Sequence, residues 1–286
     1  ERFSENEVVI SDKASDDGTK ELCKKYCEKY SNIKYFENEK IFMALNQVAV
    51  MQKATGVLRK LCNDTIVYKP GAIKYMLEMA ERYQDKKPVL FFENGKKKPK
   101  ARKSVIRKDV WETSEFYDLD SFLYRVSYGI TWIATIALWE EDCECMDGCK
   151  KYIDSCLPYV PYLLELFQKR KGAAVLEQEI MEVQIVKPKD LSYGLYKVFY
   201  QNFLGFFKNY VKEQKIRRET YQYIREDLLC GFFALWIVQF EKYPEKYKTS
   251  SEDLRALVEK EYQKDQYFGY YKKCLLKEKV KLYLRP

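Results

Sequence analysis

Two short acidic sequences stand where an apolar run gives way to a turn. Ser11-Asp12, with Asp16-Asp17-Gly18-Thr19 behind it, ends the run of residues 7–11, and Asn63-Asp64-Thr65 follows residues 57–61. Both runs are typical of buried strands. A carboxylate at a strand end can accept a base N–H or a ribose hydroxyl, or it can hold a divalent cation against a diphosphate. Asp and Gly are also ordinary turn residues, so each signal is weak alone.

The chain contains no histidine, and this limits the chemistry open to it. Ser-His and Cys-His nucleophiles, histidine bases and histidine metal ligands are excluded, which leaves carboxylates, Lys, Tyr, Cys or a bound ion. The formal net charge is +8, from 51 Lys and Arg against 43 Asp and Glu. This charge favours anionic partners such as nucleotides, acidic lipids or nucleic acid, without choosing among them.

Nine cysteines are present, an odd number, and the sequence shows no secretion signal. We therefore expect free thiols in a reducing cytoplasm. The cluster of Cys143, Cys145, Cys149 and Cys156 invites a zinc interpretation, but it lacks paired C-x2-C spacing. An acidic surface loop explains the cluster better.

Strand-like and helix-like segments alternate up to about residue 190, which predicts an α/β fold with a mostly parallel sheet. Expected strands cover residues 7–11, 32–37, 57–61, 88–93, 132–139 and 173–186, and expected helices cover residues 20–30, 43–55, 70–83 and 158–169. Beyond Pro188 the pattern becomes helical and predicts three or four helices. We thus expect a domain at residues 1–190, divided into parts 1–93 and 104–190, and a helical extension at residues 191–286.

Three further segments leave alternatives open. The basic loop of residues 94–103 is either a solvated connection or a mobile flap with phosphate-facing lysines. Trp132 and Trp139 either stack on sugar rings or pack in the core. The aromatic face from Tyr196 to Tyr210 either packs on the rest of the protein or touches a membrane surface. The apolar run of residues 228–240 is shorter than a membrane-spanning helix requires.

Four sequence motifs carry a family resemblance. SDKASDDGT (residues 11–19) resembles the SDNASTDGT turn of inverting family 2 glycosyltransferases, and NIKYFENEK (32–40), ALNQVAVMQKATG (44–56) and CNDTIVYKPGAIKYM (62–76) follow in the family's order. The likeness continues more weakly through residues 132–186. It implies a GT-A-like (Rossmann-like) fold: a mostly parallel mixed sheet flanked by helices, here with a C-terminal helical extension.

The resemblance also implies roles for individual residues. Asp12 matches the residue that recognises the nucleotide base, with Lys13 beside it, and Asn63 and Asp64 lie where the family binds the nucleotide. Asp64 stands at the first acid of the family's Asp-x-Asp signature, which contacts ribose or Mg2+ or Mn2+. Thr65 replaces the next signature acid. A hydroxyl is a poorer ligand for these ions than a carboxylate, so metal binding through Asp64 and Thr65 should be weakened.

An inverting transfer needs a carboxylate base that deprotonates the acceptor hydroxyl. We expect Asp142 in this role, with Glu140, Glu141 and Asp154 as alternatives. Some relatives carry an Asp at the start of the following helix, where this chain has Pro161.

The family's first strand has no counterpart ahead of residue 7. That strand lines the base pocket and lies centrally in the sheet, so its loss would expose the backbone of both neighbours. We therefore expect missing upstream sequence rather than a naturally incomplete pocket.

The resulting functional hypothesis is inverting transfer of a sugar from a nucleotide-diphosphate donor to a surface glycan or lipid-linked acceptor. The resemblance implies bacterial capsule, lipopolysaccharide or related polysaccharide synthesis in the cytoplasm, with peripheral contact at the inner face of the membrane. The alternative is an inactive or incomplete relative that serves as a binding scaffold. Nucleic-acid binding is disfavoured, because no recognised module is present and the basic residues are not concentrated.

Overall fold

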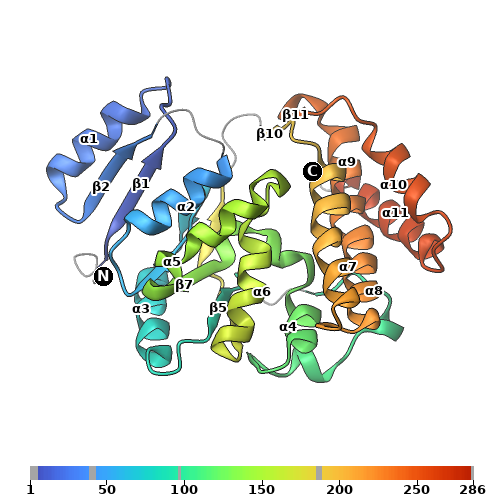
Figure 1. The fold of residues 1–286 in the computed structure, drawn as a ribbon. Coiled ribbons are helices and arrows are strands. Elements are labelled where there is room, and N and C mark those ends of the chain that lie inside the picture. The colour runs from blue at the N-terminus through green and yellow to red at the C-terminus, as the bar shows by residue number, and fades with distance from the viewer. Residues whose placement is uncertain (1–5, 39–42, 96–97, 185–188, 285–286) are drawn as a thin grey trace. The chain divides into compact units, whose positions relative to one another are not determined.

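The computed structural model describes residues 6–38, 43–95, 98–184 and 189–284, and the chain forms two compact units (Figure 1). Unit 1 comprises Glu1–Gly95 and Trp132–Val183, and unit 2 comprises Lys96–Thr131 and Gln184–Pro286. The predicted domain boundary at residue 190 therefore does not coincide with the boundary between the units. Residues 104–131, expected in the acceptor part, cluster with the helical half of the chain.

Unit 1 alternates strands with helices, as its apolar periodicity predicts. Its elements in chain order are β1 (Val8–Asp12), α1 (Thr19–Lys29), β2 (Ile33–Glu37), α2 (Met43–Lys53), β3 (Leu58–Lys60), β4 (Ile66–Tyr68), α3 (Ala72–Tyr83), β5 (Val89–Phe92), β7 (Ile136–Trp139), α5 (Glu140–Glu144), α6 (Tyr159–Arg170), β8 (Ala173–Leu176) and β9 (Met181–Val183). Gly18 and Gly71 precede α1 and α3 with φ of 84° and 83°. A side chain would strain the backbone at both turns.

The strands of unit 1 form the mixed α/β arrangement that the sequence predicts. Strands β3, β7, β5 and β8 lie in this order, with β8 parallel to β5 and with β7 antiparallel to both β3 and β5. Strands β1 and β2 pair in parallel from Val8↔Ile33 to Asp12↔Glu37. Strands β4 and β9 form a separate antiparallel pair. Because β1 and β2 are parallel, the polar residues that follow both strands lie at the same edge.

The core of unit 1 is built on β5, β7 and β8, whose residues are all buried. Such strands carry apolar residues on both faces, which explains their unbroken apolar sequences. Trp139 is only 1% exposed, and its indole N–H donates to the Pro88 carbonyl at 2.8 Å. The core interpretation of Trp139 is thereby confirmed, and Trp132 packs against the same cluster.

Unit 2 is mainly helical. Its elements are β6 (Glu115–Phe116), α4 (Leu119–Val126), β10 (Lys189–Leu191), α7 (Leu204–Lys212), α8 (Arg218–Asp227), α9 (Ala234–Lys242), β11 (Tyr247–Thr249), α10 (Leu254–Tyr262) and α11 (Phe268–Leu284), with π-helical turns at η7 (Tyr196–Phe203) and η8 (Leu228–Phe233). Strands β10 and β11 pair in parallel. Asp253 caps α10 by accepting from the Ala256 N–H at 3.0 Å.

Two segments of unit 2 settle alternatives that the sequence left open. Most of the aromatic face from Tyr196 to Tyr210 is buried, so it serves packing rather than contact with a membrane. The basic loop is fastened to the end of α8: Asp227 accepts from the Lys100 backbone N–H at 2.6 Å, and Glu226 accepts from the Arg102 N–H at 2.7 Å. This part of the loop is therefore neither a freely solvated connection nor a loose flap.

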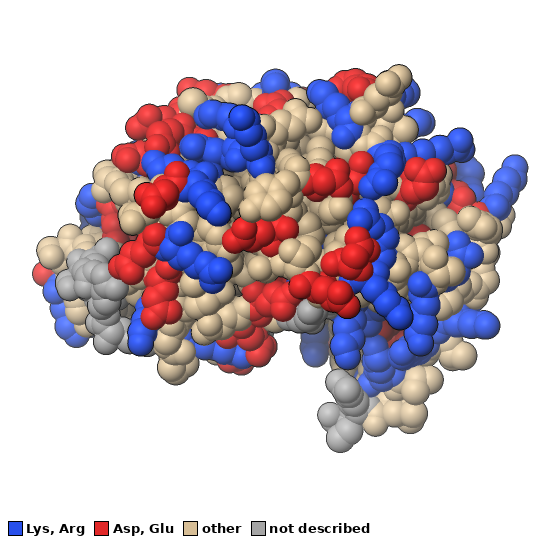
Figure 2. All heavy atoms as spheres, turned by 90° about the horizontal axis from the view of Figure 1, so that it is seen from below, with Lys and Arg blue, Asp and Glu red and all other residues tan. Residues whose placement is uncertain are grey.

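The two units differ in charge. Lys and Arg outnumber Asp and Glu in unit 2, whereas the acidic residues outnumber the basic ones in unit 1. On the face drawn in Figure 2 the two signs are interspersed, with Lys and Arg side chains gathered towards its right-hand side. Among the described residues, no helix combines the length and the apolar character needed to span a bilayer.

Candidate functional site

Asp12, the last residue of β1, is held by neutral donors. Its carboxylate accepts from the Ser15 hydroxyl at 2.5 Å, from the Ser15 backbone N–H at 3.3 Å and from the Tyr35 hydroxyl at 2.9 Å. The side chain is nearly buried, and burial acts to raise the pKa of Asp12. The hydrogen bonds from Ser15 and Tyr35 outweigh burial and hold this pKa below its ordinary value. A stable negative charge thus stands at the edge where β1 ends.

A network of amide and hydroxyl groups adjoins Asp12. The Asn46 side chain donates to the Ser11 carbonyl at 2.9 Å and accepts from the Ser11 hydroxyl at 2.8 Å. Asn38, just after β2, donates from its side chain to the Ser11 hydroxyl at 2.6 Å and from its backbone to the Asp12 carbonyl at 2.8 Å. The network fixes the ends of β1 and β2 against α2. Sequence reasoning used Asn38 and Asn46 only as parts of motifs and assigned them no role.

The segment after β3 carries polar groups that have few bonding partners among the described residues. Asp64 is exposed and forms no ion pair within the described residues. The Asn63 side-chain oxygen is buried, yet it accepts no hydrogen bond from any described group. Buried acceptors normally have a partner, so this oxygen is suited to a ligand or a water molecule. Thr65 is half-buried and Lys13, in the other loop, is exposed.

Lys60, at the end of β3, is a cation that sequence reasoning missed. Its ammonium group donates to the carbonyls of Ala134 and of Leu61, the latter at 3.3 Å, and lies 5.4 Å from the centre of the Phe92 ring. Burial lowers the pKa of Lys60 to about 8. No local pattern signals this environment, because Ala134 and Phe92 are distant in sequence.

A groove of about 470 Å³ separates β1 from β3. The Glu7 carboxylate accepts from the Thr55 backbone N–H at 2.6 Å, so the two strands begin side by side. Among the described residues β1 pairs only with β2, and β3 only with β7. Each of the two strands that contribute residues to this groove therefore has one edge without a strand partner. Its lining is mostly apolar and includes Lys60, Cys62 and Tyr68 but none of the predicted nucleotide-binding residues.

Asp142, the expected catalytic base, occupies a different environment. Its side chain is 1% exposed and accepts from the Arg170 guanidinium at 2.8 and 3.0 Å and from the Lys169 ammonium at 3.2 Å. The Tyr162 hydroxyl donates to its backbone carbonyl. A buried carboxylate paired with two cations is typical of a structural ion pair. The catalytic role of Asp142 stays a prediction, and its bonding does not favour that role.

A divalent cation would find few protein ligands here. Across the described ranges, no group of three or more His, Cys, Asp or Glu side chains is arranged to hold a metal ion. Asp64 offers one carboxylate, and Thr65 adds a weakly coordinating hydroxyl. This donor set fits an ion only if a bound diphosphate supplies most of the oxygen ligands. All nine cysteines are free thiols, as the sequence predicts.

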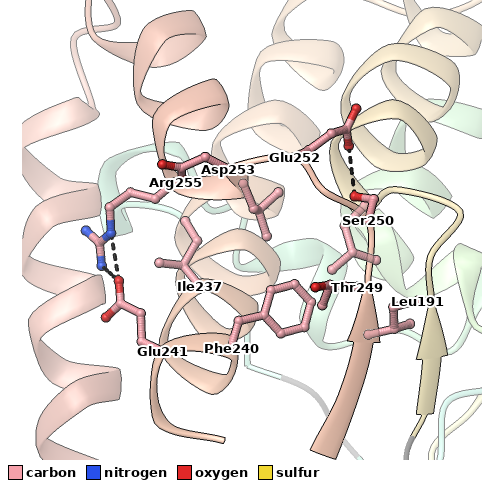
Figure 3. Close-up of a pocket in the computed structure, with 11 residues that line it drawn as sticks. Leu191, Ile237, Phe240, Glu241, Thr249, Ser250, Glu252, Asp253 and Arg255 are labelled. Atoms are coloured by element: carbon pink, nitrogen blue, oxygen red, sulfur yellow. Dashed lines mark hydrogen bonds and ion pairs between the residues drawn. The ribbon is translucent and has the colours of Figure 1, made fainter. Parts of the chain in front are cut away.

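A second cavity, of about 360 Å³, lies within unit 2 and is lined by residues of α9, the end of β11 and the start of α10 (Figure 3). Ile237 and Phe240 form an apolar wall, and the Arg255 guanidinium donates to Glu241 at 2.8 Å. The Ser250 hydroxyl donates to the Glu252 carboxylate at 3.3 Å. These polar groups thus bond to one another in two pairs.

Comparisons with known proteins agree with this architecture. The family model described as glycosyl transferase family 2 matches residues 2–134. The fold is similar to the crystal structure of S. aureus TarS 1-349 (TM-score 0.52, 15% identity), over 96% of this chain and 79% of that one. It is also similar to S. aureus TarS (TM-score 0.51, 16% identity), over 96% of this chain and 48% of that one.

A third similar structure is S. aureus TarS 1-349 in complex with UDP (TM-score 0.51, 15% identity), over 96% of this chain and 79% of that one. No curated protein sequence matches the chain. The family match places the acidic segments at the ends of β1 and β3 inside the matched region, and the fold likeness extends over almost the whole chain. The family 2 model thus matches residues 2–134, somewhat less than half of the chain, and the chain has a GT-A-like fold.

Proposed function

We propose that this glycosyltransferase transfers a sugar, with inversion, from a nucleotide-diphosphate donor that binds where β1 and β3 end. The acceptor in this proposal is a growing surface glycan or a lipid-linked glycan. Asp12 and Lys13 bind the base side of the nucleotide, while Asn63 and Asp64 bind its ribose and diphosphate. The observation that carries the proposal is the unsatisfied Asn63 oxygen beside an exposed Asp64 that forms no ion pair with any described residue.

The strand geometry supports a common site for these residues. Glu7 and Thr55 join the starts of β1 and β3, so both strands run from a shared edge. In α/β folds ligands bind at the carboxyl ends of the strands, and Asp12 and the segment of Asn63 and Asp64 stand at the ends of β1 and β3. One of the similar structures is a complex with UDP, which makes UDP the first nucleotide to try.

The test is calorimetric titration of the protein with UDP, GDP, CDP and dTDP, with and without Mg2+ or Mn2+. We expect one nucleotide to bind most tightly, and Asp64→Ala to weaken that binding. Asp85→Ala is the matched control, because Asp85 is an exposed acid on a loop outside the site. If none of the four nucleotides binds, the donor site proposed here is wrong.

The metal has its own test, since Asp64 alone can supply a carboxylate. A cation at this position offsets the charge that develops on the departing diphosphate. We expect Mg2+ or Mn2+ to bind only together with nucleotide. Thr65→Asp should restore a second carboxylate and tighten metal-dependent nucleotide binding by about ten-fold, in keeping with a charge-assisted contact. Unchanged affinity would show that residue 65 does not face the ion.

One observation favours a second candidate, a binding scaffold without transfer. The carboxylate of Asp142, the expected base, forms an ion pair with Arg170. The alternative bases Glu140, Glu141 and Asp154 lie nearby in the sequence. The scaffold function would be supported if the protein binds a nucleotide but neither hydrolyses the matching nucleotide sugar nor transfers its sugar. Sugar transfer abolished by one of these carboxylate substitutions, with folding intact, would instead identify the base.

A further inference from the structure

Helix α11 exposes an apolar stripe although it belongs to a folded unit. Leu276, Val280, Tyr283 and Leu284 are 63, 47, 56 and 76% exposed. Their spacing of four, seven and eight residues from Leu276 places them on one face of the helix, over about 12 Å of its length. The opposite face carries buried Tyr271 and Leu275, and α11 packs through it on α9 and η8. The stripe is therefore turned away from the core of unit 2.

Lysines border this stripe on both sides. By helical geometry Lys272 and Lys279 fall on one flank, and Lys273 and Lys277 on the other. Lys272 and Lys279 pair with Glu259 and Glu241 of neighbouring helices. Lys273 and Lys277 are exposed and form no ion pair with any described residue. The cation charge on that flank is consequently available to a partner.

The exposed face of α11, a helix described along its whole length, carries no carboxylate. The single acid of the helix, Glu278, lies towards the packed side, is half-buried and pairs with Lys281 at 2.8 Å. The end of α11 is held in place as well, because the Lys242 ammonium donates to the Leu282 carbonyl and lies 4.7 Å from the Tyr283 ring centre. The stripe and its lysines thus form one ordered surface, which we name the α11 surface.

We propose that the α11 surface docks this protein on a membrane surface that contains anionic lipids. An exposed apolar stripe between rows of lysine is the pattern of helices that lie in the interface, with apolar side chains among the acyl chains and lysines at the headgroups. Tyr283 suits this place, because tyrosine favours membrane interfaces. The excess of Lys and Arg in unit 2 adds a longer-range attraction to the same surface. The proposal does not depend on which nucleotide the enzyme binds.

The experiment is flotation of the full chain with two kinds of vesicle: phosphatidylcholine alone, and phosphatidylcholine mixed with phosphatidylglycerol. We expect binding to the anionic vesicles at low ionic strength and release as salt is raised, because screening shortens from about 30 Å at 0.01 M to about 8 Å at 0.15 M. Absence of binding to anionic vesicles at low salt overturns the proposal.

Two pairs of variants locate the contact. Leu276→Ser with Val280→Ser should lower the partition coefficient about ten-fold, because apolar side chains no longer enter the bilayer. Lys273→Ser with Lys277→Ser should lower it about five-fold per lysine. The matched controls are Leu235→Ser on α9 and Lys208→Ser on α7, which alter exposed residues of the same unit and should change nothing.

Two results would assign the α11 surface otherwise. If the controls weaken binding as much as the α11 variants, attraction is diffuse and the assignment fails. If vesicles are not bound but size-exclusion chromatography shows self-association that the Leu276 and Val280 substitutions abolish, the stripe is an interface between copies. Thermal unfolding of each variant tests whether misfolding is the cause. We expect each variant to unfold at the same temperature as the unchanged protein, because all four substituted α11 positions are exposed.

Discussion

The carboxylates of Asp12 and Asp142 are both nearly buried in unit 1, yet they are bonded in opposite ways. Asp12 receives hydrogen bonds from hydroxyl and backbone N–H groups, which carry no formal charge. Asp142 receives them from Arg170 and Lys169, which do. Neutral donors stabilise a carboxylate and leave its charge to act on a ligand, whereas an ion pair cancels that charge. The bonding partners, more than burial, distinguish a binding carboxylate from a structural one.

The largest effect should follow from Asp142→Asn. Removal of one partner from a buried pair leaves Arg170 without its counter-charge, and we expect the free energy of unfolding to fall by about 3 kcal/mol. Urea unfolding followed by circular dichroism measures this. A matched variant, Asp154→Asn, removes an exposed acid and should change stability by less than about 0.5 kcal/mol. A stable Asp142→Asn protein that has lost only transfer would instead make Asp142 the catalytic base.

Asp64→Ala tests the binding side of the comparison. We expect nucleotide affinity to fall by about 1.5–3 kcal/mol, the value of one charge-assisted contact, with little change in stability because Asp64 is exposed. Titration calorimetry and urea unfolding, run on the same preparation, give the two quantities separately. Equal affinity in the substituted and unchanged proteins would reduce Asp64 to a turn residue.

Lys60 extends the comparison to a buried cation. The pKa of Lys60 is about 8 in the folded chain and about 10.4 in the unfolded one, so the unfolded chain binds more protons between these values. The contribution of Lys60 to stability should therefore rise with pH across this window. We expect the stability difference between the unchanged protein and Lys60→Met to shift by about 2.5 kcal/mol between pH 7 and pH 10. A constant difference would show that Lys60 is well hydrated in solution.

The smallest effect concerns acid. The pKa of Asp12 is lower in the folded chain than in the unfolded one, so its stabilising contribution is complete above about pH 4 and is lost as pH falls through that range. In the Asp12→Asn variant, the loss of unfolding free energy as pH falls through this range should be smaller by roughly 0.5–1 kcal/mol. Unfolding midpoints measured between pH 3 and pH 6 would detect it. An identical acid limb would mean that the bonds from Ser15 and Tyr35 also form in the protonated state.

Local sequence predicted the elements of unit 1 closely. The helix expected at residues 158–169 is α6, Tyr159–Arg170, and the strand expected at 88–93 is β5, Val89–Phe92. Apolar periodicity and Gly or Pro at the turns carry this information within a few residues. The same patterns place Asp12 and Asp64 directly after apolar runs, and the strands β1 and β3 do end at or just before these residues.

Relationships between distant segments were not predictable in this way. The attachment of residues 100–102 to Glu226 and Asp227 assigns the middle of the chain to unit 2, and no local pattern announces it. The burial of Lys60 and the pairing of Asp142 with Arg170 likewise depend on contacts across many residues. The resemblance named Asp142 from its position in the order of motifs, which contains no information on its partners.

The groove between β1 and β3 has a consequence for which shapes can enter it. Residues of β1 and β3 line it, and among the described residues each of these strands pairs with one other strand only, so one backbone edge of each has no strand partner. A helix satisfies its own backbone groups and gains nothing from such edges, whereas an extended segment can bond to them. An extended segment with apolar side chains therefore suits this mostly apolar groove better than a helix does.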